Sequence, residues 1–200
     1  MKTSALRTSL IALAFAAGGA IASTPGQPAP AFTVNDAAGK PVSLADHRGK
    51  YVVLEWTNPD CPFVQKHYVS SNMQLLQKEF AGKGVVWLSV NSTSRSHPEF
   101  KPGEEMARWM KSHGGAPASV LIDETSATGR AYAARTTPHM LVIDPKGQVV
   151  YAGAIDDKRS ANPADAKAAN NYVRAALDES LAGKPVTVAQ TRPYGCSVKY

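Results

Sequence analysis

The residues best suited to chemistry lie in the stretch EWTNPDCPFVQKH, which runs from Glu55 to His67. Cys61 is one of two cysteines in the 200-residue chain, and Pro62 follows it directly. Proline is favoured in the first turn of a helix, so this pattern predicts that Cys61 stands at a helix N-terminus. Unpaired backbone N–H groups and the positive end of the helix dipole favour the thiolate form of a cysteine there. We therefore predict that Cys61 is a nucleophilic thiol rather than an inert buried cysteine.

The second cysteine, Cys196, lies in the Gly- and Pro-containing tail RPYGCSVKY. Val64 occupies the position where a Cys-x-x-Cys motif would have its second cysteine, so Cys61 can pair within the chain only with Cys196. In a mobile tail, Cys196 can attack a sulfenic acid or a mixed disulfide on Cys61. In a locked tail, the pair is a structural disulfide that restricts the unfolded chain by about 5 kcal/mol. We favour the resolving role, and the sequence leaves both open.

Glu55 is an acidic residue inside the apolar run YVVLEW, residues 51–56, which we predict to be a strand covered on both faces. An ionised carboxylate is costly in such a place, and burial should raise its pKa above the ordinary value of about 4.3. A carboxyl group of this kind can exchange a proton with a reacting sulfur near neutral pH. The alternatives are that strand alternation turns Glu55 toward solvent, or that it pairs with a basic residue such as Lys66.

The elements that must position these residues follow from hydrophobic periodicity and from Gly and Pro punctuation. The order is strand, helix, strand, helix, strand, helix, hairpin, helix, which predicts one α/β domain with a mixed central sheet and helices on both faces. The predicted strands are two short pieces within 31–44, then 51–56, 85–90, 119–123, 140–143 and 148–152. The predicted helices run from Cys61 to about Phe80 and over 104–113, 127–134 and 164–181.

This order of elements, together with the motifs NPDCPFVQKHY and RPYGCSVKY and a Thr-Pro before the hairpin, resembles the thioredoxin fold. More narrowly, the chain resembles the peroxiredoxin-like redoxin group of the alkyl hydroperoxide reductase and thiol-specific antioxidant superfamily. The resemblance implies that Cys61 is the reactive thiol, that Pro138 is a cis-proline facing it, and that Glu55 is the buried acid of thioredoxins. It implies thiol-based reduction of a peroxide or exchange with a protein disulfide, with antioxidant activity in the first case.

The chain departs from the family patterns near Cys61. Leu54 and Asn58 stand where a typical peroxiredoxin has Pro and Thr or Ser, and Val64 stands where a thioredoxin has its second cysteine. The predicted substrate pocket comprises Asn58, Pro62, Thr137, Pro138 and His139. His139 follows Pro138 directly, so its side chain points either into this site or to the other face of the sheet. We expect His67 to be a surface or half-buried histidine, and Arg130 and Arg135 to face solvent unless one of them steadies a thiolate.

The first 22 residues have the features of a signal peptide. Lys2 and Arg7 give a positive start, an apolar stretch follows over 10–20, and Ala20-Ile21-Ala22 is a small-x-small cleavage site. We predict a signal peptide at 1–22, a single thioredoxin-like domain at 23–200 with a cysteine-containing tail at 184–200, and a location in the periplasm or outside the cell. No segment is long enough for stable membrane insertion.

The net charge and the absence of cofactor motifs limit the kinds of molecule that the protein is expected to bind. Removing Lys2 and Arg7 takes the formal net charge from +6 to +4, which is 20 basic minus 16 acidic residues. The basic residues are scattered, so we predict no nucleic-acid binding. No nicotinamide, flavin or phosphate-binding motif is present, so we predict no cofactor and expect a thiol reductant protein to supply electrons.

The alternative to an enzyme is a copper-handling or other binding module on the same fold. Thioredoxin-fold copper chaperones pair two thiolates spaced Cys-x-x-x-Cys with a distant histidine, and Gln65 occupies the second of these positions. Cys61 and His139 alone would make a poor metal site unless Cys196 joined them, so we predict no metal ligands. A third possibility is a non-enzymatic scaffold with a structural Cys61–Cys196 disulfide.

Overall fold

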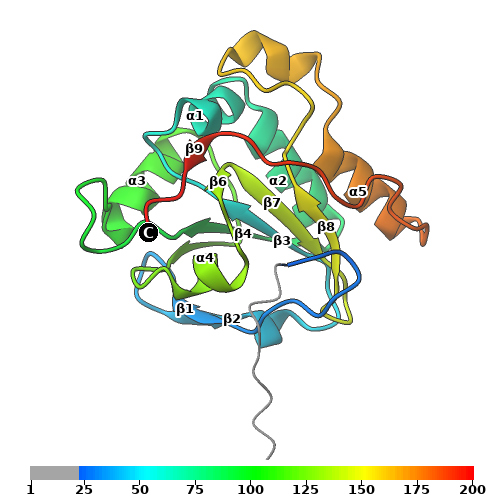
Figure 1. The fold of residues 1–200 in the computed structure, drawn as a ribbon, viewed down its shortest axis with the longest axis horizontal. Helices are drawn as coiled ribbons and strands as arrows, with labels where there is room; N and C mark the ends of the chain where they lie inside the picture. The colour runs from blue at the N-terminus through cyan, green and yellow to red at the C-terminus, as the bar shows by residue number, and fades with distance from the viewer. Residues whose placement is uncertain (1–22) are drawn as a thin grey trace, which may run out of the picture.

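A five-stranded mixed sheet forms the centre of the protein in a computed structural model, which describes residues 23–200 (Figure 1). Its order is β5-β4-β3-β7-β8, with β3, β4 and β5 parallel and β7 antiparallel to both β3 and β8. The bounds are β3 Val52–Trp56, β4 Val86–Asn91, β5 Ser119–Ile122, β7 His139–Ile143 and β8 Val149–Gly153. The predicted α/β fold class is confirmed, whereas the predicted signal peptide lies outside the described residues.

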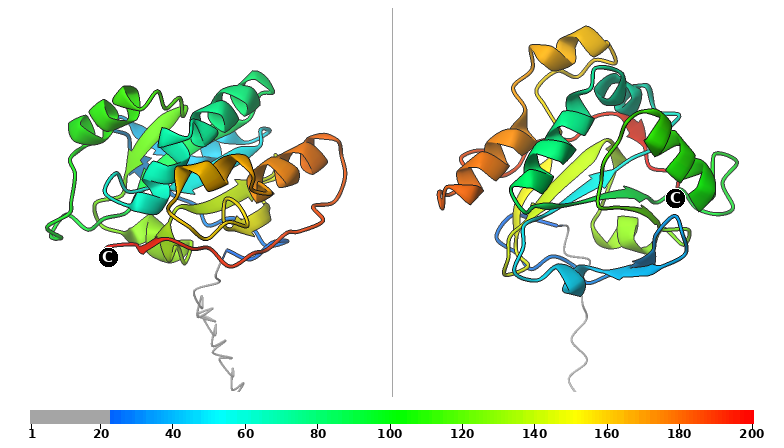
Figure 2. Two further views of the ribbon diagram at one scale, coloured as in Figure 1. Left: turned by 90° about the horizontal axis from the view of Figure 1, so that it is seen from above. Right: turned by 180° about the vertical axis from the view of Figure 1, so that it is seen from behind.

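The two faces of the sheet carry different layers (Figure 2). Along β3, Val53 packs into one hydrophobic cluster, whereas Leu54 and Trp56 pack into another, because successive strand side chains point to opposite faces. The first face is covered by α1 Pro62–Val69, α2 Asn72–Gly82, α3 Gly103–Ser112 and α5 Tyr172–Leu181. The second face is covered by β1 Thr33–Asn35, β2 Pro41–Ser43, the 3-10 helix η1 Leu44–His47 and α4 Ala127–Ala131 with the residues after it.

Two predicted helices are each divided in the structure. The helix predicted from Cys61 to about Phe80 breaks where Ser71 adopts a left-handed backbone with φ of 62°, which separates α1 from α2. After the break, α2 buries Leu76 and Phe80, whereas Leu75 is 61% exposed. The helix predicted over 164–181 is the 3-10 helix η2, Pro163–Lys167, followed by α5, whose start is capped by the Asn171 side chain accepting the Arg174 N–H at 2.9 Å.

The C-terminal tail folds back across the molecule. From the end of α5 it passes β8, where Gln190 pairs with Ala152, and reaches the short strand β6, Thr136–Thr137. There β9, Cys196–Ser197, pairs antiparallel with β6, as the red segment of Figure 1 shows. The tail therefore carries Cys196 to the start of the β7–β8 hairpin. No helix within residues 23–200 combines the length and apolarity needed to cross a membrane.

Candidate active site

Cys61 occupies the N-cap position of α1, with Pro62 in the first turn, as the sequence predicts. Its side chain is 1% exposed, and its Sγ donates a hydrogen bond to the Thr137 carbonyl oxygen at 3.0 Å. The Cys61 carbonyl accepts the N–H groups of Val64 and Gln65, each at 2.9 Å, which starts the helix. The sulfur thus lies at the positive end of α1, between the helix and the segment before Pro138.

The turn before Cys61 is held by side chains on both sides. The Asn58 Oδ1 accepts the Asp60 N–H at 2.9 Å, and the Asn58 carbonyl accepts the Cys61 N–H at 3.1 Å. From within α1, the Gln65 amide donates to the Pro59 carbonyl at 2.8 Å. Asparagine favours such turns because its side chain can bond the backbone two residues on. The Asn58 side-chain oxygen, predicted to shape the pocket, therefore fixes the loop that presents Cys61.

Cys196 lies against Cys61 because β9 pairs Cys196 with Thr137, whose carbonyl accepts the Cys61 thiol. Both cysteines are free thiols. Burial, a hydrogen bond with Cys61 and the Cys61 charge raise the pKa of Cys196 to about 12. Two thiols in contact resist ionising together, so Cys196 is the member of the pair that holds its proton more tightly than an ordinary cysteine. The structure thus brings the two predicted cysteines together.

The Thr137–Pro138 peptide bond is cis, which confirms the prediction. The Thr137 backbone contacts both cysteines. Its carbonyl accepts the Cys61 thiol, and its strand β6 pairs Thr137 with Cys196 of β9. Its side-chain hydroxyl is buried and has no hydrogen-bond partner among residues 23–200. That hydroxyl is available to a bound substrate or to a water molecule.

Glu55 is fully buried on the α1 side of β3, as predicted from the strand pattern. The Tyr68 hydroxyl donates to its Oε1 at 2.8 Å, and its Oε2 accepts bonds from Trp87 at 2.8 Å, Ser89 at 3.0 Å and Gln77 at 3.1 Å. Burial raises the pKa of Glu55, and the four hydrogen bonds, with that from Trp87 the largest, partly offset the rise. The suggested alternatives, solvent exposure or a pair with Lys66, are wrong. The role of Glu55 as a proton donor stays a prediction, because these four bonds link it to the core and not to Cys61.

Replacing Glu55 with glutamine should stabilise the protein increasingly as pH rises. A carboxyl group with a raised folded pKa binds its proton more tightly when folded, so its contribution to stability is present below the pKa of an ordinary glutamate and is lost as pH rises through the folded pKa. Glutamine carries no charge to desolvate, and we expect a gain of about 1 kcal/mol or more in unfolding free energy near neutral pH. Urea unfolding from about pH 4 to about pH 8 measures it.

The matched control is Glu104→Gln, since the Glu104 side chain on α3 is 86% exposed. Contributions from other buried groups, including the histidines, cancel when each variant is subtracted from the parent at the same pH. A Glu55→Gln difference that is flat with pH, like that of the control, would show that burial does not perturb Glu55.

The histidines do not join the site. His139 is 7% exposed, its ring lies 6.2 Å from that of Trp56, and its Nδ1 accepts the Arg135 N–H at 3.3 Å. Burial, and then the charge of Arg135, lowers the pKa of His139 to about 4. Alternation along β7 places His139 on the face of Trp56 and Met140 on the face of Cys61, so His139 belongs to the other face rather than to the predicted pocket. His67, expected to be at the surface or half-buried, is fully buried, so that prediction is wrong.

Comparison with known proteins decides the family. The model of the AhpC/TSA family matches residues 25–152, which is more than half of the chain. The chain belongs to the AhpC/TSA family. The matched residues contain Cys61, Glu55 and Pro138, whereas the tail with Cys196 lies beyond them.

Individual relatives of this AhpC/TSA family protein agree with the fold. Thiol-disulfide oxidoreductase ResA of Bacillus subtilis (strain 168) is 30% identical over 128 residues, which are 62% of this chain and 64% of the relative, so the match spans less than two thirds of its length. The crystal structure of an uncharacterized conserved protein from Geobacillus kaustophilus matches with a TM-score of 0.78 and 31% identity, over 89% of this chain and 93% of the other. The thioredoxin domain of thiol-disulfide oxidoreductase BVU-2223 from Bacteroides vulgatus matches with a TM-score of 0.52 and 23% identity, over 64% and 87% of the two chains, which shows the thioredoxin-like fold alone.

Sequence reasoning missed two contributors to the site of this AhpC/TSA family protein. Gly195 has φ of 136°, and a Cβ there would lie 2.0 Å from the Thr137 carbonyl oxygen, so only glycine allows the tail to come this close. Tyr194 is buried and packs edge-on against Phe63 of α1, with ring centroids 5.9 Å apart. The dipeptide Tyr-Gly directly before Cys196 was the available signal, because glycine marks close backbone approach.

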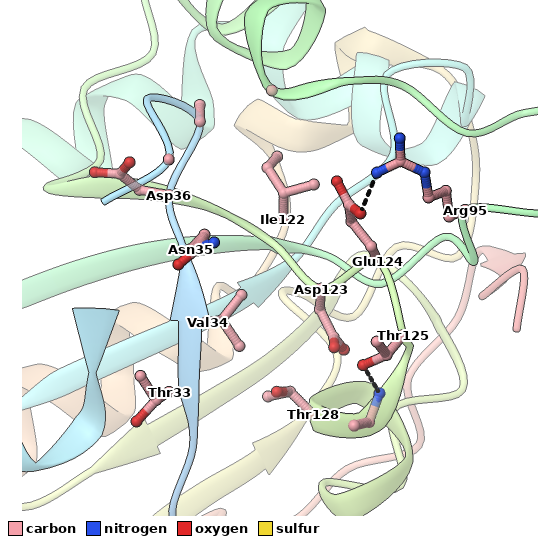
Figure 3. A pocket seen from close by; sticks show the side chains of 14 residues that line it. Thr33, Val34, Asn35, Asp36, Arg95, Ile122, Asp123, Glu124, Thr125 and Thr128 are labelled. Atoms are coloured by element: carbon pink, nitrogen blue, oxygen red, sulfur yellow. Dashed lines mark hydrogen bonds and ion pairs between the residues drawn. The ribbon is translucent and has the colours of Figure 1, made fainter. Parts of the chain in front are cut away.

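A polar cavity of about 600 Å³ lies away from this site, between β1, the end of β5 and the start of α4 (Figure 3). None of the described residues that line it belongs to the predicted site. Its acidic groups are engaged: Glu124 pairs with Arg95 at 2.7 Å, and Asp123 accepts the Ser92 hydroxyl at 2.6 Å and a backbone N–H at 2.8 Å. The cavity therefore gives no argument for function.

The alternative hypothesis of a copper-handling module requires Cys61, Cys196 and His139 to lie close enough together to bind a metal ion. Within residues 23–200, no group of three or more His, Cys, Asp or Glu side chains is placed to hold a metal ion. The two thiols meet, but His139 lies on the other face of the sheet.

Proposed function

We propose that this protein is an exported thiol-disulfide oxidoreductase that cycles through a Cys61–Cys196 disulfide. The observation that carries the proposal is the contact between the two thiols, at a helix N-terminus and beside the Thr137 carbonyl. The similarity to thiol-disulfide oxidoreductase ResA supports the reaction class. Export rests on the charge and apolar pattern of residues 1–22, which we propose are removed to leave one domain with its tail.

The reaction consists of two thiol exchanges. The Cys61 thiolate attacks one sulfur of a protein disulfide, forming a mixed disulfide and releasing the other sulfur as a thiolate that takes up a proton. Cys196 then loses its proton and attacks the Cys61 sulfur, forming the Cys61–Cys196 disulfide and releasing the second substrate thiol. The substrate disulfide gains two electrons, and the two cysteines lose them. A reductant protein with two thiols returns them.

Because the pKa of Cys196 is raised, a base must remove its proton before Cys196 can attack in the second step. Its value of about 12 reflects burial and the nearby Cys61 sulfur, and once Cys61 is joined to substrate the charge on that sulfur is gone. Deprotonation of Cys196 then becomes easier, so the order of the two attacks is built into the pair. Cys61 attacks first, and Cys196 resolves.

Peroxide reduction by the same thiol is the competing substrate class for an AhpC/TSA family protein. There Cys61 would attack the peroxide, become a sulfenic acid and release water or alcohol, and Cys196 would displace hydroxide from it. Asn58 stands where the typical peroxiredoxin motif has a hydroxyl, and its side-chain oxygen is bonded to the Asp60 N–H. We therefore place disulfide exchange first.

The deciding experiment mixes the reduced protein with hydrogen peroxide and, separately, with a peptide disulfide, and follows the mass of each cysteine after an acid quench. We expect Cys61 to react with the disulfide at least about tenfold faster than a free cysteine at the same pH. Cys61→Ser should show no such reaction. Faster reaction with peroxide than with the disulfide would move the assignment to a peroxidase, and a Cys61 no faster than free cysteine toward either would overturn it.

A further inference from the structure

A buried polar cluster joins the tail to the helix that carries Cys61. Its members are Lys66, Asp156 and Tyr194, which are 1%, 2% and 8% exposed. The Lys66 Nζ donates to the Asp156 Oδ2 at 3.4 Å, to the Lys158 carbonyl at 2.7 Å and to the Tyr194 hydroxyl oxygen at 3.3 Å. All three ammonium hydrogens thus have acceptors.

Tyr194 is the member that belongs to the tail. Its hydroxyl donates to the Asp156 Oδ1, and the Lys66 Nζ lies 5.5 Å from the centre of its ring. Burial, and then Asp156, raises the pKa of Tyr194, so the hydroxyl keeps its proton and remains a donor. A charge-assisted hydrogen bond in a buried place is among the stronger polar contacts in proteins.

His67 is a further titratable group in contact with the cluster, while Asp157 and Arg159 act on Tyr194 with smaller and opposite effects. The His67 Nε2 lies 3.8 Å from the Asp156 Oδ2, and burial, with a smaller contribution from Lys66, lowers the pKa of His67 to about 3. The histidine is therefore neutral, and Lys66 is the cation that balances Asp156. On the chain, Lys66 is five residues after Cys61, and Tyr194 is two residues before Cys196.

We propose that Tyr194, held by the Lys66–Asp156 pair, is a positioning residue that keeps the Cys196 strand closed over Cys61. This inference deepens the proposed function and rests on it. In the closed arrangement Cys61 is 1% exposed, so a protein disulfide reaches its sulfur only when the tail opens. The same contact that sets the local concentration of Cys196 for the resolving step thus covers the nucleophile between turnovers.

The test measures access to Cys61 without any disulfide chemistry. In a Cys196→Ser background, the rate of iodoacetamide alkylation of Cys61 is compared with and without Tyr194→Phe. Phenylalanine keeps the ring packed on Phe63 and removes only the hydroxyl. We expect alkylation to speed up by about fivefold or more, because the cost of opening the tail falls by the loss of one buried hydrogen bond. An unchanged rate would overturn the proposal.

The matched control is Tyr132→Phe, which removes a hydroxyl donating to the Pro30 carbonyl at 2.6 Å on the other face of the sheet. It should leave alkylation of Cys61 unchanged, and thermal unfolding of each variant shows whether the whole fold was weakened. If Tyr132→Phe accelerates alkylation as much as Tyr194→Phe, general destabilisation explains both and the proposal fails.

A second measurement separates positioning from stability. With Cys196 present, Tyr194→Phe should lower the equilibrium constant for the Cys61–Cys196 disulfide in a glutathione buffer by about fivefold, since Cys196 spends less time beside Cys61. Tyr132→Phe should not change it, and an unchanged constant in Tyr194→Phe would contradict a positioning role. If alkylation accelerates but the parent reduces no disulfide, the anchor stands and the proposed function fails.

Discussion

Replacing Gly195 with alanine should move the Cys196 strand away from Cys61 and lower the equilibrium constant for their disulfide by about tenfold or more. The alanine Cβ would lie 2.0 Å from the Thr137 carbonyl oxygen and 2.7 Å from its carbon, and both are backbone atoms that cannot rotate away. The same oxygen accepts the Cys61 thiol. Relief of the clash therefore separates β9 from β6, and Cys196 moves with it.

Gly183→Ala is the matched control for this substitution. Gly183 also has a positive φ, 70°, and nothing lies within 4 Å of a Cβ placed there, so alanine adds backbone strain without a clash. Both variants are equilibrated with reduced and oxidised glutathione, quenched with acid and analysed by mass. If the Gly195→Ala disulfide forms as readily as that of Gly183→Ala, the close approach of the tail does not position Cys196.

The central sheet and the place of Cys61 could be predicted because their signals are local. The run YVVLEW contains β3, and proline after Cys61 marks the start of α1. The break at Ser71 could not be predicted in the same way. A serine in a left-handed conformation is set by tertiary packing and not by its own preference, and one such residue separates α1 from α2.

The position of the C-terminal tail at the candidate site could not be predicted from local sequence patterns either. The sequence left Cys196 either mobile or locked, because a pairing of Thr137 with Cys196 joins segments far apart in the chain and no local pattern encodes it. Lysine side chains are usually exposed, so the sequence gives no sign that Lys66 is buried. Only the fold shows that Lys66 contacts Asp156 and Tyr194. The prediction that His139 lines the substrate pocket is wrong for a similar reason. Whether a residue next to Pro138 faces Cys61 or the opposite core depends on the strand register, which the local sequence does not determine.

Cys196→Ser is expected to stop turnover while leaving one reaction of Cys61 intact. Serine preserves the size of the side chain and the β6–β9 pairing, but its hydroxyl cannot resolve a mixed disulfide. Cys61 should attack a peptide disulfide once and remain joined to one peptide, which gives a stable mass increase. Steady-state reduction with the same reductant should fall by about 100-fold or more, because each cycle would then wait for an external thiol.

The first attack by Cys61 in Cys196→Ser should be about as fast as in the parent, because Cys61 stays at the N-terminus of α1 and the serine hydroxyl can replace the Cys196 thiol as a hydrogen-bond donor to the Cys61 sulfur. This outcome distinguishes the resolving role from a structural disulfide. A structural bridge would instead make the oxidised parent more stable by about 5 kcal/mol in the chain-entropy account, with Cys61 unreactive in both proteins. Stopped-flow mixing followed by intact mass gives the rate of attack and the fate of the adduct in one experiment. If Cys196→Ser turns over at the parent rate, Cys196 resolves nothing, and the contact between the two sulfurs has another purpose.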